Sequence, residues 1–297
     1  MSFRSWSLSS YQTQTRLFLV PYLLGTLVLV VLPALATVAI SFTEYNAIRP
    51  PTWVGLENFA KVLSSPLVRL SLRNSFLFVL LAVPLRILGA LLLALLLQPA
   101  GRHLGFFRTS VYIPTIIPET AYALIWLWVF NPLYGPLNAF LNWLGLPVVG
   151  WLVEPQSAQL AMVVMALFQI GEGFIVALVA LRTIPRSLYE AATVDGANKW
   201  QSFWRITLPL IVPWLLLLSL RDLVVSLQNT FAPTFIMTYG GPYYATTYVP
   251  LLLYELGFDF FKFGEAAALL VVFYVLTGLL AIGMINLVGL GRQADIA

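Results

Sequence analysis

The sequence predicts an all-α, polytopic membrane protein with six transmembrane helices. Of its 297 residues, 60% are hydrophobic and 9% are charged, and the mean hydropathy is +0.89. A soluble domain carries about 25% charged residues, so water would not solvate this chain as a globule. The apolar residues also gather into six runs, each long enough to cross a bilayer as a helix.

The first apolar run, residues 17–40, could be mistaken for a secretory signal peptide, because Ala34-Leu35-Ala36 imitates a cleavage site. It is longer than the apolar core of a signal peptide and five more runs follow it, so we expect a retained helix and a membrane-lipid environment. The other predicted spans are residues 76–97, 110–130, 158–181, 206–227 and 265–287.

Prolines and glycines predict irregularities in these helices. Pro114 and Pro118 are expected to kink the third span, because proline lacks the amide hydrogen and clashes with the preceding turn. The Gly-Glu-Gly sequence at residues 171–173 interrupts the fourth span. Between the first two spans, an amphipathic stretch that begins at residues 55–59 predicts an interfacial helix.

The basic residues predict the orientation of the spans. Six spans place both termini and the loop between the fourth and fifth spans on one side of the membrane. Nine of the 16 Lys and Arg residues lie on that side and five on the other, which makes it cytoplasmic by the positive-inside rule. We therefore expect cytoplasmic segments at residues 1–16 and 291–297 around a transmembrane domain at 17–290. The net charge of +4 fits this orientation, and no basic patch indicates nucleic acid.

The loop at residues 181–209 combines charges, glycine and helix signals. Ser187 and Glu190 have the spacing of a capping box at a helix start. We predict a helix over residues 188–194 that ends at Asp195-Gly196, because glycine adopts the left-handed conformation of a helix end at little cost. A second helix is then expected over residues 197–205, with an aromatic face made of Trp200, Phe203 and Trp204.

The same loop carries a motif. It contains E-A-A-x-x-D-G-A from Glu190 and F-x-x-I-T-L-P from Phe203. This pattern resembles the EAA loop of ABC-importer permeases, whereas a plain amphipathic connector is the alternative interpretation. The resemblance implies the type I ABC importer permease fold and a cytoplasmic coupling helix that docks into an ATPase. The residues that match this EAA coupling helix and its end are Leu188, Tyr189, Glu190, Ala191, Ala192, Asp195, Gly196 and Ala197.

Shorter pieces extend the resemblance to the carbohydrate branch of these permeases, the maltose, lactose and glycerol-phosphate type. It implies a heterodimer with a second homologous permease, two ATP-binding cassette ATPase subunits and an extracytoplasmic solute-binding protein. It also implies a sugar substrate and a place in the plasma (inner) membrane. The pieces are Ser41-Phe42-Thr43, Gly55-Leu56-Glu57-Asn58, Tyr134-Gly135-Pro136, Gly240-Gly241-Pro242 and Gly264-Glu265-Ala266.

The chain itself lacks the motifs of an enzyme. It has no G-x-x-x-x-G-K-[ST] loop, so we expect ATP and Mg to be bound by the partner ATPases. The zinc-protease and serine-hydrolase motifs are missing as well. Cysteine is absent and His103 stands alone in a short basic loop. We therefore expect no catalytic residue, metal site or cofactor in this chain.

Ionisable residues within a span cost about 2.5–3.5 kcal/mol each on insertion scales, so each needs a reason. Carboxylates, amides and aromatic faces suit a hydroxyl-rich sugar, which makes a substrate pathway one interpretation. Pairing between helices is the other, and we expect it for Arg86, Arg221 and Asp222. Glu119 shares a helical face with Tyr122 at i+3 and Trp126 at i+7. The candidate pathway residues are Glu119, Tyr122, Trp126, Gln169, Glu172, Asn229 and Thr230.

Alternatives to a sugar importer remain open at this stage. Arg86 and Arg221 favour a phosphorylated polyol such as glycerol phosphate if they face the pathway. An ion-coupled secondary transporter would use the intramembrane carboxylates as relays. Such transporters are often built from inverted repeats, which this sequence does not show, and that function leaves the EAA pattern unexplained. No group of catalytic residues in the sequence supports a function as a membrane enzyme, and none of its motifs indicates a scaffold.

Overall fold

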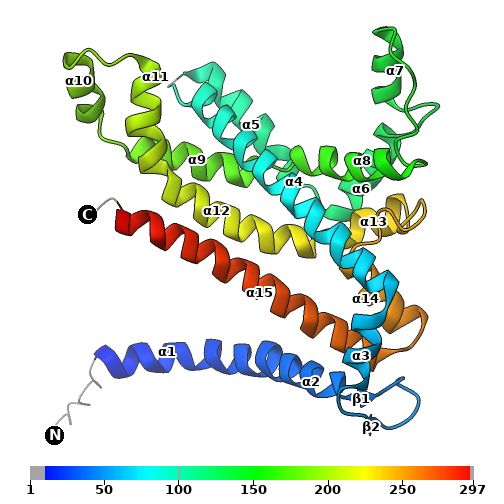
Figure 1. Cartoon of the computed structure of the whole chain (residues 1–297). Coiled ribbons are helices and arrows are strands. Elements are labelled where there is room, and N and C mark those ends of the chain that lie inside the picture. Colours follow the sequence, from blue (N-terminus) through cyan, green and yellow to red (C-terminus); the bar gives the residue numbers. More distant parts are fainter. Residues whose placement is uncertain (1–10, 100, 295–297) are drawn as a thin grey trace, which may run out of the picture. The chain divides into compact units, whose positions relative to one another are not determined.

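The computed structural model describes residues 11–99 and 101–294, and most of them are helical. They divide into two compact units (Figure 1). The first unit holds the described residues up to Leu63 together with Leu256–Val271, and the second holds Ser64–Glu255 and the described residues from Val272 onward. Of the predicted cytoplasmic termini, residues 1–10 and 295–297 lie outside the described residues.

In the first unit, α1 (Tyr11–Thr26) and α2 (Leu32–Ser41) form one helical run through a π-helical turn, η1 (Leu27–Val31). Pro33 accounts for the wider turn, because its ring and its missing amide hydrogen disturb the i→i−4 bonds before it. The section Leu17–Ser41 is long and apolar enough to cross a membrane, so the first predicted span is confirmed.

The rest of the first unit lies where this span ends. β1 (Thr43–Glu44) pairs with β2 (Thr52–Trp53) in an antiparallel hairpin, and α3 (Glu57–Ser64) follows. The predicted amphipathic helix is therefore present. The unit is completed by the π-helical turn η3 (Glu255–Asp259) and the first turns of α15 (Phe263–Ala294).

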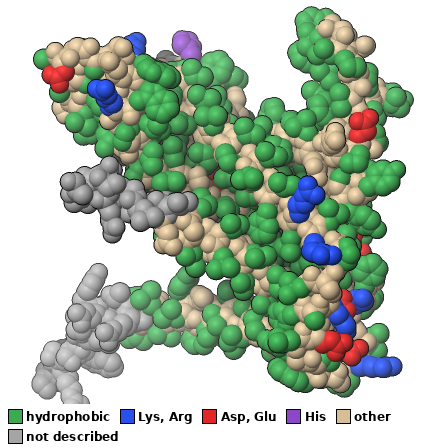
Figure 2. Space-filling view, in the orientation of Figure 1, with side chains coloured by type: hydrophobic (Ala, Val, Ile, Leu, Met, Phe, Trp, Pro, Cys, Tyr) green, Lys and Arg blue, Asp and Glu red, His purple; other side chains and the backbone are tan. Residues whose placement is uncertain are grey.

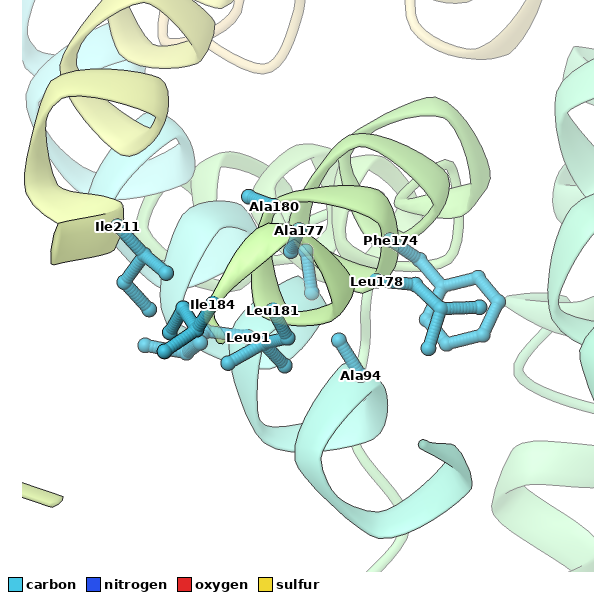
Figure 3. Packing of buried hydrophobic residues seen from close by; sticks show 10 residues of the cluster. Leu91, Ala94, Phe174, Ala177, Leu178, Ala180, Leu181, Ile184 and Ile211 are labelled. Carbon is cyan, nitrogen blue, oxygen red and sulfur yellow. The ribbon is translucent and has the colours of Figure 1, made fainter. Parts of the chain in front are cut away.

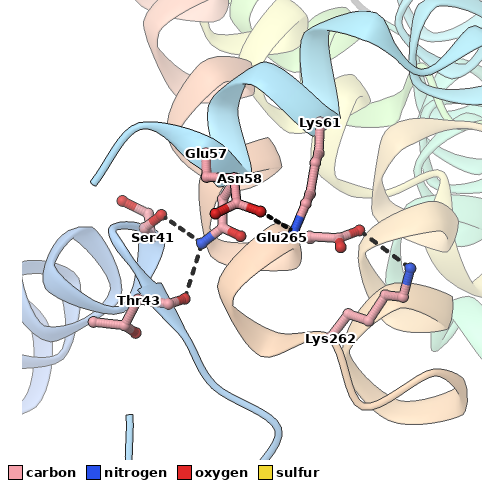
Figure 4. Close-up of polar contacts among 7 residues, drawn as sticks. All are labelled: Ser41, Thr43, Glu57, Asn58, Lys61, Lys262 and Glu265. Atoms are coloured by element: carbon pink, nitrogen blue, oxygen red, sulfur yellow. Dashed lines mark hydrogen bonds and ion pairs between the residues drawn. The ribbon is translucent and has the colours of Figure 1, made fainter. Parts of the chain in front are cut away.

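Asn58 joins these parts (Figure 4). Its buried amide donates hydrogen bonds to the backbone oxygens of Ser41 and Thr43, both at 2.9 Å. Gly264 lies so close to the same place that a Cβ atom would overlap the oxygen of Thr43. Three separate sequence motifs thus meet in one junction, which fixes the ends of α2, α3 and α15 within this unit.

Two ion pairs lie beside the junction on the surface (Figure 4). Lys61 Nζ lies 2.8 Å from Glu57 on α3, and Lys262 Nζ lies 3.5 Å from Glu265 at the start of α15. The hydrogen bond to Glu57 raises the pKa of Lys61. Exposed pairs of this kind add little stability, so the junction depends mainly on the buried amide of Asn58.

The second unit is built around α4 (Pro66–Leu97). This helix packs against α8 (Pro155–Leu167), α9 (Gly171–Thr183) and α12 (Leu208–Gln228). The other elements of this unit, besides the later turns of α15, are α5 (Arg102–Ile116), α6 (Glu119–Val129), α7 (Pro136–Trp143), α10 (Arg186–Val194), α11 (Lys199–Ser202), η2 (Phe203–Thr207), α13 (Phe231–Met237) and α14 (Val249–Tyr254).

A cluster of buried apolar side chains connects α4, α9 and α12 (Figure 3). Leu91 and Ala94 of α4 face Ala177 and Leu181 of α9, and Ile211 adds a side chain from α12. Alanine at several of these positions lets the helix backbones approach closely, which is typical of helix packing in membranes. This core holds together the two helices that flank the α10 loop.

Four helical runs among the described residues are long and apolar enough to cross a membrane: Leu17–Ser41, Pro66–Leu97, Lys199–Met237 and Phe263–Asn286. They agree with the first, second, fifth and sixth predicted spans. Helices α8 and α9, bent by 46° at their junction, count as a fifth if the pair is one span, and the predicted interruption lies there. Hydrophobic side chains cover most of the face in Figure 2, as expected of a protein solvated by lipid.

The third predicted span is more broken than the sequence indicated. A single kinked helix was expected over residues 110–130, but α5 ends at Ile116 and α6 begins at Glu119. Ile117 is extended because the residue before a proline is driven out of the helical region. Neither α5 nor α6 is by itself among the helices that are long and apolar enough to cross a membrane. The total of six spans therefore remains a prediction.

Candidate functional site

A cavity of about 150 Å³ lies in the second unit, among α4, α6, α8, α9, α12 and α13. Six of the seven predicted pathway residues line it, although they come from segments more than 100 residues apart in the sequence. These six are Glu119, Tyr122, Gln169, Glu172, Asn229 and Thr230.

Trp126 is the exception. It packs against Phe130 and Phe168, with ring centroids 4.9 and 5.0 Å apart, and it lines a separate apolar hollow instead. Trp126 does share a helical face with Glu119, as the spacing predicted. Seven residues correspond to about 10 Å along the helix axis, however, which carries its ring beyond the cavity.

Local structure positions the carboxylates and the tyrosine. Glu119 lies in the first turn of α6, where the helix dipole favours a negative charge. The hydroxyl of Tyr122 donates to the backbone oxygen of Met165 at 2.8 Å, so its ring faces the cavity while its polar end is already paired. Glu172 lies in the first turn of α9, directly after the break from α8.

Gly171 explains why the break occurs at this point. A Cβ atom there would lie only 2.9 Å from the Cα of Tyr112 and 3.0 Å from the oxygen of Val111 on α5. Only glycine permits α9 to begin this close to α5. The close approach fixes the first turn of α9, and with it the carboxylate of Glu172 at the cavity wall.

Two ion pairs lie at one end of the cavity. Arg221 of α12 pairs with Glu172 of α9, and both side chains are about half exposed. Arg86 of α4 pairs with Asp222 of α12, and both of those are largely buried. The expectation that Arg86, Arg221 and Asp222 are paired is met, but Arg221 is joined to a candidate pathway residue rather than to Asp222.

Several polar atoms at the cavity have no hydrogen-bond partner within the described chain, although they are buried. They are the hydroxyl oxygens of Thr115, Ser226 and Thr230, which line the cavity. The second carboxylate oxygen of Asp222, the partner of Arg86, is unpaired as well but lies outside the cavity lining. Buried polar groups are nearly always paired, so unpaired ones at a cavity indicate bound water or a ligand. The sequence interpretation missed Thr115 and Ser226. The stripe of Asp222, Ser226 and Thr230, four residues apart on one helical face, was the signal that could have found Ser226.

The predicted coupling helix is α10, which spans Arg186–Val194 and has no buried residue. Its end is as predicted: Gly196 has φ +79°, and the amides of Gly196 and Ala197 donate to the oxygens of Thr193 and Ala192 at 3.1 and 2.8 Å. Its start is not. The N-cap is Pro185 without a side-chain hydrogen bond, so the predicted capping box of Ser187 and Glu190 is wrong. Because the helix begins earlier, both residues lie inside it.

The capping box of this loop lies one helix later. Asn198 Oδ1 accepts from the amide of Gln201, and Gln201 Oε1 accepts from the amide of Asn198, both at 2.9 Å. Helix α11 therefore begins at Lys199 rather than at the predicted Ala197. It continues through η2, where Pro209 has the same effect on the preceding turn as Pro33 has in the first unit.

Tyr189 ties α10 to the membrane helices. Its hydroxyl lies 2.8 Å from the Oγ1 of Thr207, and its partly buried ring packs against the core cluster of α4, α9 and α12. The predicted aromatic face is present, but its rings pack mainly on one another: Trp204 lies 5.5 Å from Trp200 and 5.4 Å from Phe203 between ring centroids. Leu188, Glu190 and Ala191 are exposed.

The sequence profile of the binding-protein-dependent transport system inner membrane components matches residues 87–290. The chain belongs to this family. It is therefore a multi-pass membrane permease subunit of the ABC-transporter class rather than an ion-coupled secondary transporter. The family profile covers the six predicted pathway residues of the cavity and the α10 loop together.

Relatives of this permease support the assignment. It is 34% identical over 270 residues to the probable ABC transporter permease protein YesP of Bacillus subtilis, covering 89% of this chain and 87% of the relative. It is 32% identical over 262 residues to the trehalose/maltose transport system permease protein MalF of Thermococcus litoralis, covering 88% of each.

The fold of the permease also matches a solved structure. A chain of the bacterial alginate ABC transporter, crystallised in complex with an alginate pentasaccharide-bound periplasmic protein, superposes with a TM-score of 0.80. The match covers 95% of this permease and 96% of that chain at 24% identity. The fold is thus that of an ABC-importer permease, as the sequence resemblance implied.

Proposed function

We propose that this permease and a homologous partner form the alternating-access path of an ATP-driven importer for a neutral sugar or oligosaccharide. An extracytoplasmic solute-binding protein would deliver the sugar, and two partner ATPases would bind ATP and Mg. The observation that carries the proposal is the cavity, which gathers six predicted pathway residues and three unpaired hydroxyl groups. The MalF relative, named for trehalose and maltose transport, supports a sugar.

The chemistry of the cavity suits a polyhydroxylated ligand. Glu119 offers acceptors, Gln169 and Asn229 offer both donors and acceptors, and the hydroxyls of Ser226 and Thr230 do the same. The ring of Tyr122 adds an apolar wall. A sugar presents hydroxyl groups around its edge and apolar C–H faces, so it would satisfy the unpaired polar atoms and cover the ring.

The charge balance favours a neutral sugar over a phosphorylated polyol. Both arginines line the cavity, but each is already paired with a carboxylate: Arg86 with Asp222, and Arg221 with Glu172. Glu119 has no ion-pair partner among the described residues, and no unpaired positive charge in the cavity lining is left to meet a phosphate. A phosphate group would have to break an ion pair and approach Glu119, whereas a neutral sugar does neither.

The coupling residues of α10 are proposed to link this cavity to ATP hydrolysis. Helix α9 runs from Glu172 at the cavity to the α10 loop, a length of about 20 Å for its 13 residues. Helix α12 returns from the loop to Asn229 at the cavity, and the Arg221–Glu172 pair joins the two helices there. A displacement of α10 would therefore move both cavity walls. Reversing access from 1:99 to 99:1 needs about 5.5 kcal/mol of differential binding.

The same proposal sets the location of each segment. The α10 loop at residues 181–209 and both termini, residues 1–16 and 291–297, would lie in the cytoplasm, around the transmembrane permease domain at 17–290. The loop between α13 and α14 would lie on the extracytoplasmic side, because one membrane-crossing helix, α12, separates it from α10. The positive-inside count supports this orientation.

ATPase activity of the reconstituted complex, measured with its binding protein across a ligand panel, tests the proposal. The panel holds monosaccharides, disaccharides, oligosaccharides and glycerol phosphate. Stimulation by one class of neutral sugar is the expected result. Stimulation by glycerol phosphate alone would contradict the charge argument, and an ATPase that does not depend on this chain would contradict the importer function itself.

A further inference from the structure

A second, smaller hollow lies in the second unit, at the end of the cavity that holds the two ion pairs. Its volume is about 20 Å³. Its walls include all four members of these pairs, called the charge cluster below: Arg86, Glu172, Arg221 and Asp222. Every member of the charge cluster except Asp222 also lines the cavity. The charge cluster therefore forms a wall that the hollow and the cavity share.

The hollow has the size and the polarity of a site for one water molecule. A buried water needs about 10–15 Å³ of space and two to four polar partners. Asp222 is 5% exposed, and its Oδ2 atom has no hydrogen-bond partner within the described chain, whereas its Oδ1 accepts from Arg86. Gln169 adds a side-chain amide to the same walls. The formal charges of the cluster sum to zero, so the hollow suits a neutral water better than an ion.

The charge cluster marks the end of the cavity that is nearer to the α10 loop. On each of α4, α9 and α12, the cavity-lining residue closest to that loop is charged. These residues are Arg86, Glu172 and Arg221. The direction of α4 follows from Leu95, near its C-terminal end, which lines a surface hollow together with Tyr189 of α10. The charge cluster thus lies between the cavity and the proposed coupling helix.

The three helices come together directly beyond the charge cluster. A Cβ atom on Gly173 would lie 3.3 Å from the Cβ of Ala90 on α4 and 3.3 Å from Leu218 Cδ2 on α12. Ala90 follows Arg86 by one turn of α4. Leu218 precedes Asp222 by one turn of α12, so both contacts lie on the loop side of the charge cluster. The apolar core in Figure 3 follows, and its close packing closes this end of the cavity.

The two ion pairs of the charge cluster differ in burial. The side chains of Arg86 and Asp222 are 12% and 7% exposed, and this buried pair joins α4 to α12. The side chains of Arg221 and Glu172 are 49% and 44% exposed, and this exposed pair joins α12 to α9. Breaking a buried pair leaves a charge in an apolar environment, whereas the members of an exposed pair are hydrated when they separate. The exposed pair can therefore open while the buried pair stays closed.

We propose that the exposed pair is a gate that closes the cavity toward α10, and that the buried pair and one ordered water molecule form its fixed base. The gate rests on the proposed function, which supplies the sugar path and the movement of α10. A displacement of α10 would shift the first turn of α9 relative to α12, so the exposed pair would separate. Asp222 directly follows Arg221, and both line the hollow. The water at Asp222 Oδ2 is thus placed to hydrate the guanidinium of Arg221 as it leaves Glu172.

Labelling of a single cysteine tests the gate, because the chain has no native cysteine. Asn229→Cys places the thiol at an exposed position of the cavity, and a membrane-impermeant maleimide is added to inside-out vesicles that contain the assembled transporter. In this parent chain, the labelling rates with and without a non-hydrolysable ATP analogue should differ at least fivefold. Glu172→Gln breaks the exposed pair at nearly constant side-chain size, so it should label at the faster of the two rates in both conditions.

Two further variants separate a gate from a general disturbance of the cavity. Glu119→Gln removes a carboxylate from the same cavity but outside the charge cluster, and it should keep the fivefold difference. Exchanging the charges, Glu172→Arg with Arg221→Glu, should recover a difference of at least threefold. A Glu172→Gln chain that keeps the fivefold difference would overturn the gate, and so would a Glu119→Gln chain that loses it.

The labelling needs neither sugar nor binding protein, so its outcome is separate from that of the ATPase panel. A failed panel overturns the proposed function itself. If the panel succeeds but the analogue leaves the labelling rate of the parent chain unchanged, the gate alone is overturned. Cryo-electron microscopy of the transporter in nanodiscs tests the base: one water should lie within about 3.2 Å of Asp222 Oδ2. A protein group bonded to that atom in place of the water would contradict the base.

Discussion

The cavity and the α10 loop lie at opposite ends of the same two helices, α9 and α12, and are built in contrasting ways. The cavity holds buried charges and buried hydroxyls contributed by helices distant in sequence. Helix α10 has no buried residue and depends on local caps and on the contact of Tyr189 with Thr207. Loss of a buried charge beside the cavity should therefore affect folding, whereas a change at an exposed residue of α10 should affect coupling alone.

The largest expected effect is at the buried pair. Asp222→Ala leaves the guanidinium of Arg86 buried without its partner, which should lower the free energy of unfolding by about 3–5 kcal/mol. The measurement is chemical unfolding of the purified chain in mixed micelles. The double variant Arg86→Met with Asp222→Leu should recover most of the loss, because an apolar pair removes both charges. If Asp222→Ala were as stable as the wild type, the buried pair would not be needed for folding, and the contrast between the cavity and α10 would be refuted.

Glu190→Lys should leave stability nearly unchanged but impair transport, the opposite of the effect expected for Asp222→Ala. This residue is exposed on α10, so the free energy of unfolding should change by less than about 0.5 kcal/mol. Sugar uptake by the reconstituted transporter should nevertheless fall at least tenfold, since the reversed charge lies on the predicted ATPase-docking helix. Glu44→Lys, at an exposed carboxylate of the β1 strand, serves as the control and should transport normally. Normal uptake by the α10 variant would argue against a coupling role.

The link between α10 and the membrane helices should give a smaller effect. Tyr189→Phe removes the 2.8 Å hydrogen bond to Thr207 and should cost about 0.5–1.5 kcal/mol. The number of ATP molecules hydrolysed per sugar transported should rise, because α10 is less firmly joined to α12. Thr207→Val should have the same effect, and combining the two should add little. Full additivity would show that the two hydroxyls act separately.

The smallest expected effect separates the two capping sites of the loop. Asn198→Ala removes the observed capping box and should cost about 1 kcal/mol of stability. Ser187→Ala should cost almost nothing, because Ser187 makes no cap hydrogen bond in the structure. Thermal unfolding of the two variants side by side measures the difference. If Ser187→Ala were less stable than Asn198→Ala, the capping box of Ser187 and Glu190 that the sequence suggested would be supported instead.

Local signals predicted α10 well because helix ends depend on few residues. Asp195-Gly196 ended the helix as expected, since the left-handed residue is needed wherever the chain turns. The start was misassigned because S-x-x-E also occurs inside helices, and only the position of Pro185 decides between the two. The box at Asn198 and Gln201 has an equivalent spacing but uses the less familiar N-x-x-Q pair.

Six residues of the cavity were predicted from the sequence, but its geometry was not. Intramembrane polarity identified Glu119 and Glu172, because such residues are costly in lipid. Asn229 and Thr230 were chosen as polar residues just past the fifth predicted span. Polarity gave no information on pairing: which carboxylate meets Arg86 or Arg221 depends on how α4, α9 and α12 pack. The distance of Trp126 from the cavity also depends on where α6 meets its neighbours.

Cysteine accessibility at Asn229 tests the central claim most directly, because the chain has no native cysteine. In the reconstituted transporter carrying Asn229→Cys, mass spectrometry of this chain would follow alkylation with and without the transported sugar and a non-hydrolysable ATP analogue. We predict that the sugar slows alkylation and that the analogue changes its rate at least fivefold, with the analogue effect lost when Glu190→Lys is added. Alkylation that ignores both ligands would contradict a sugar path coupled to α10.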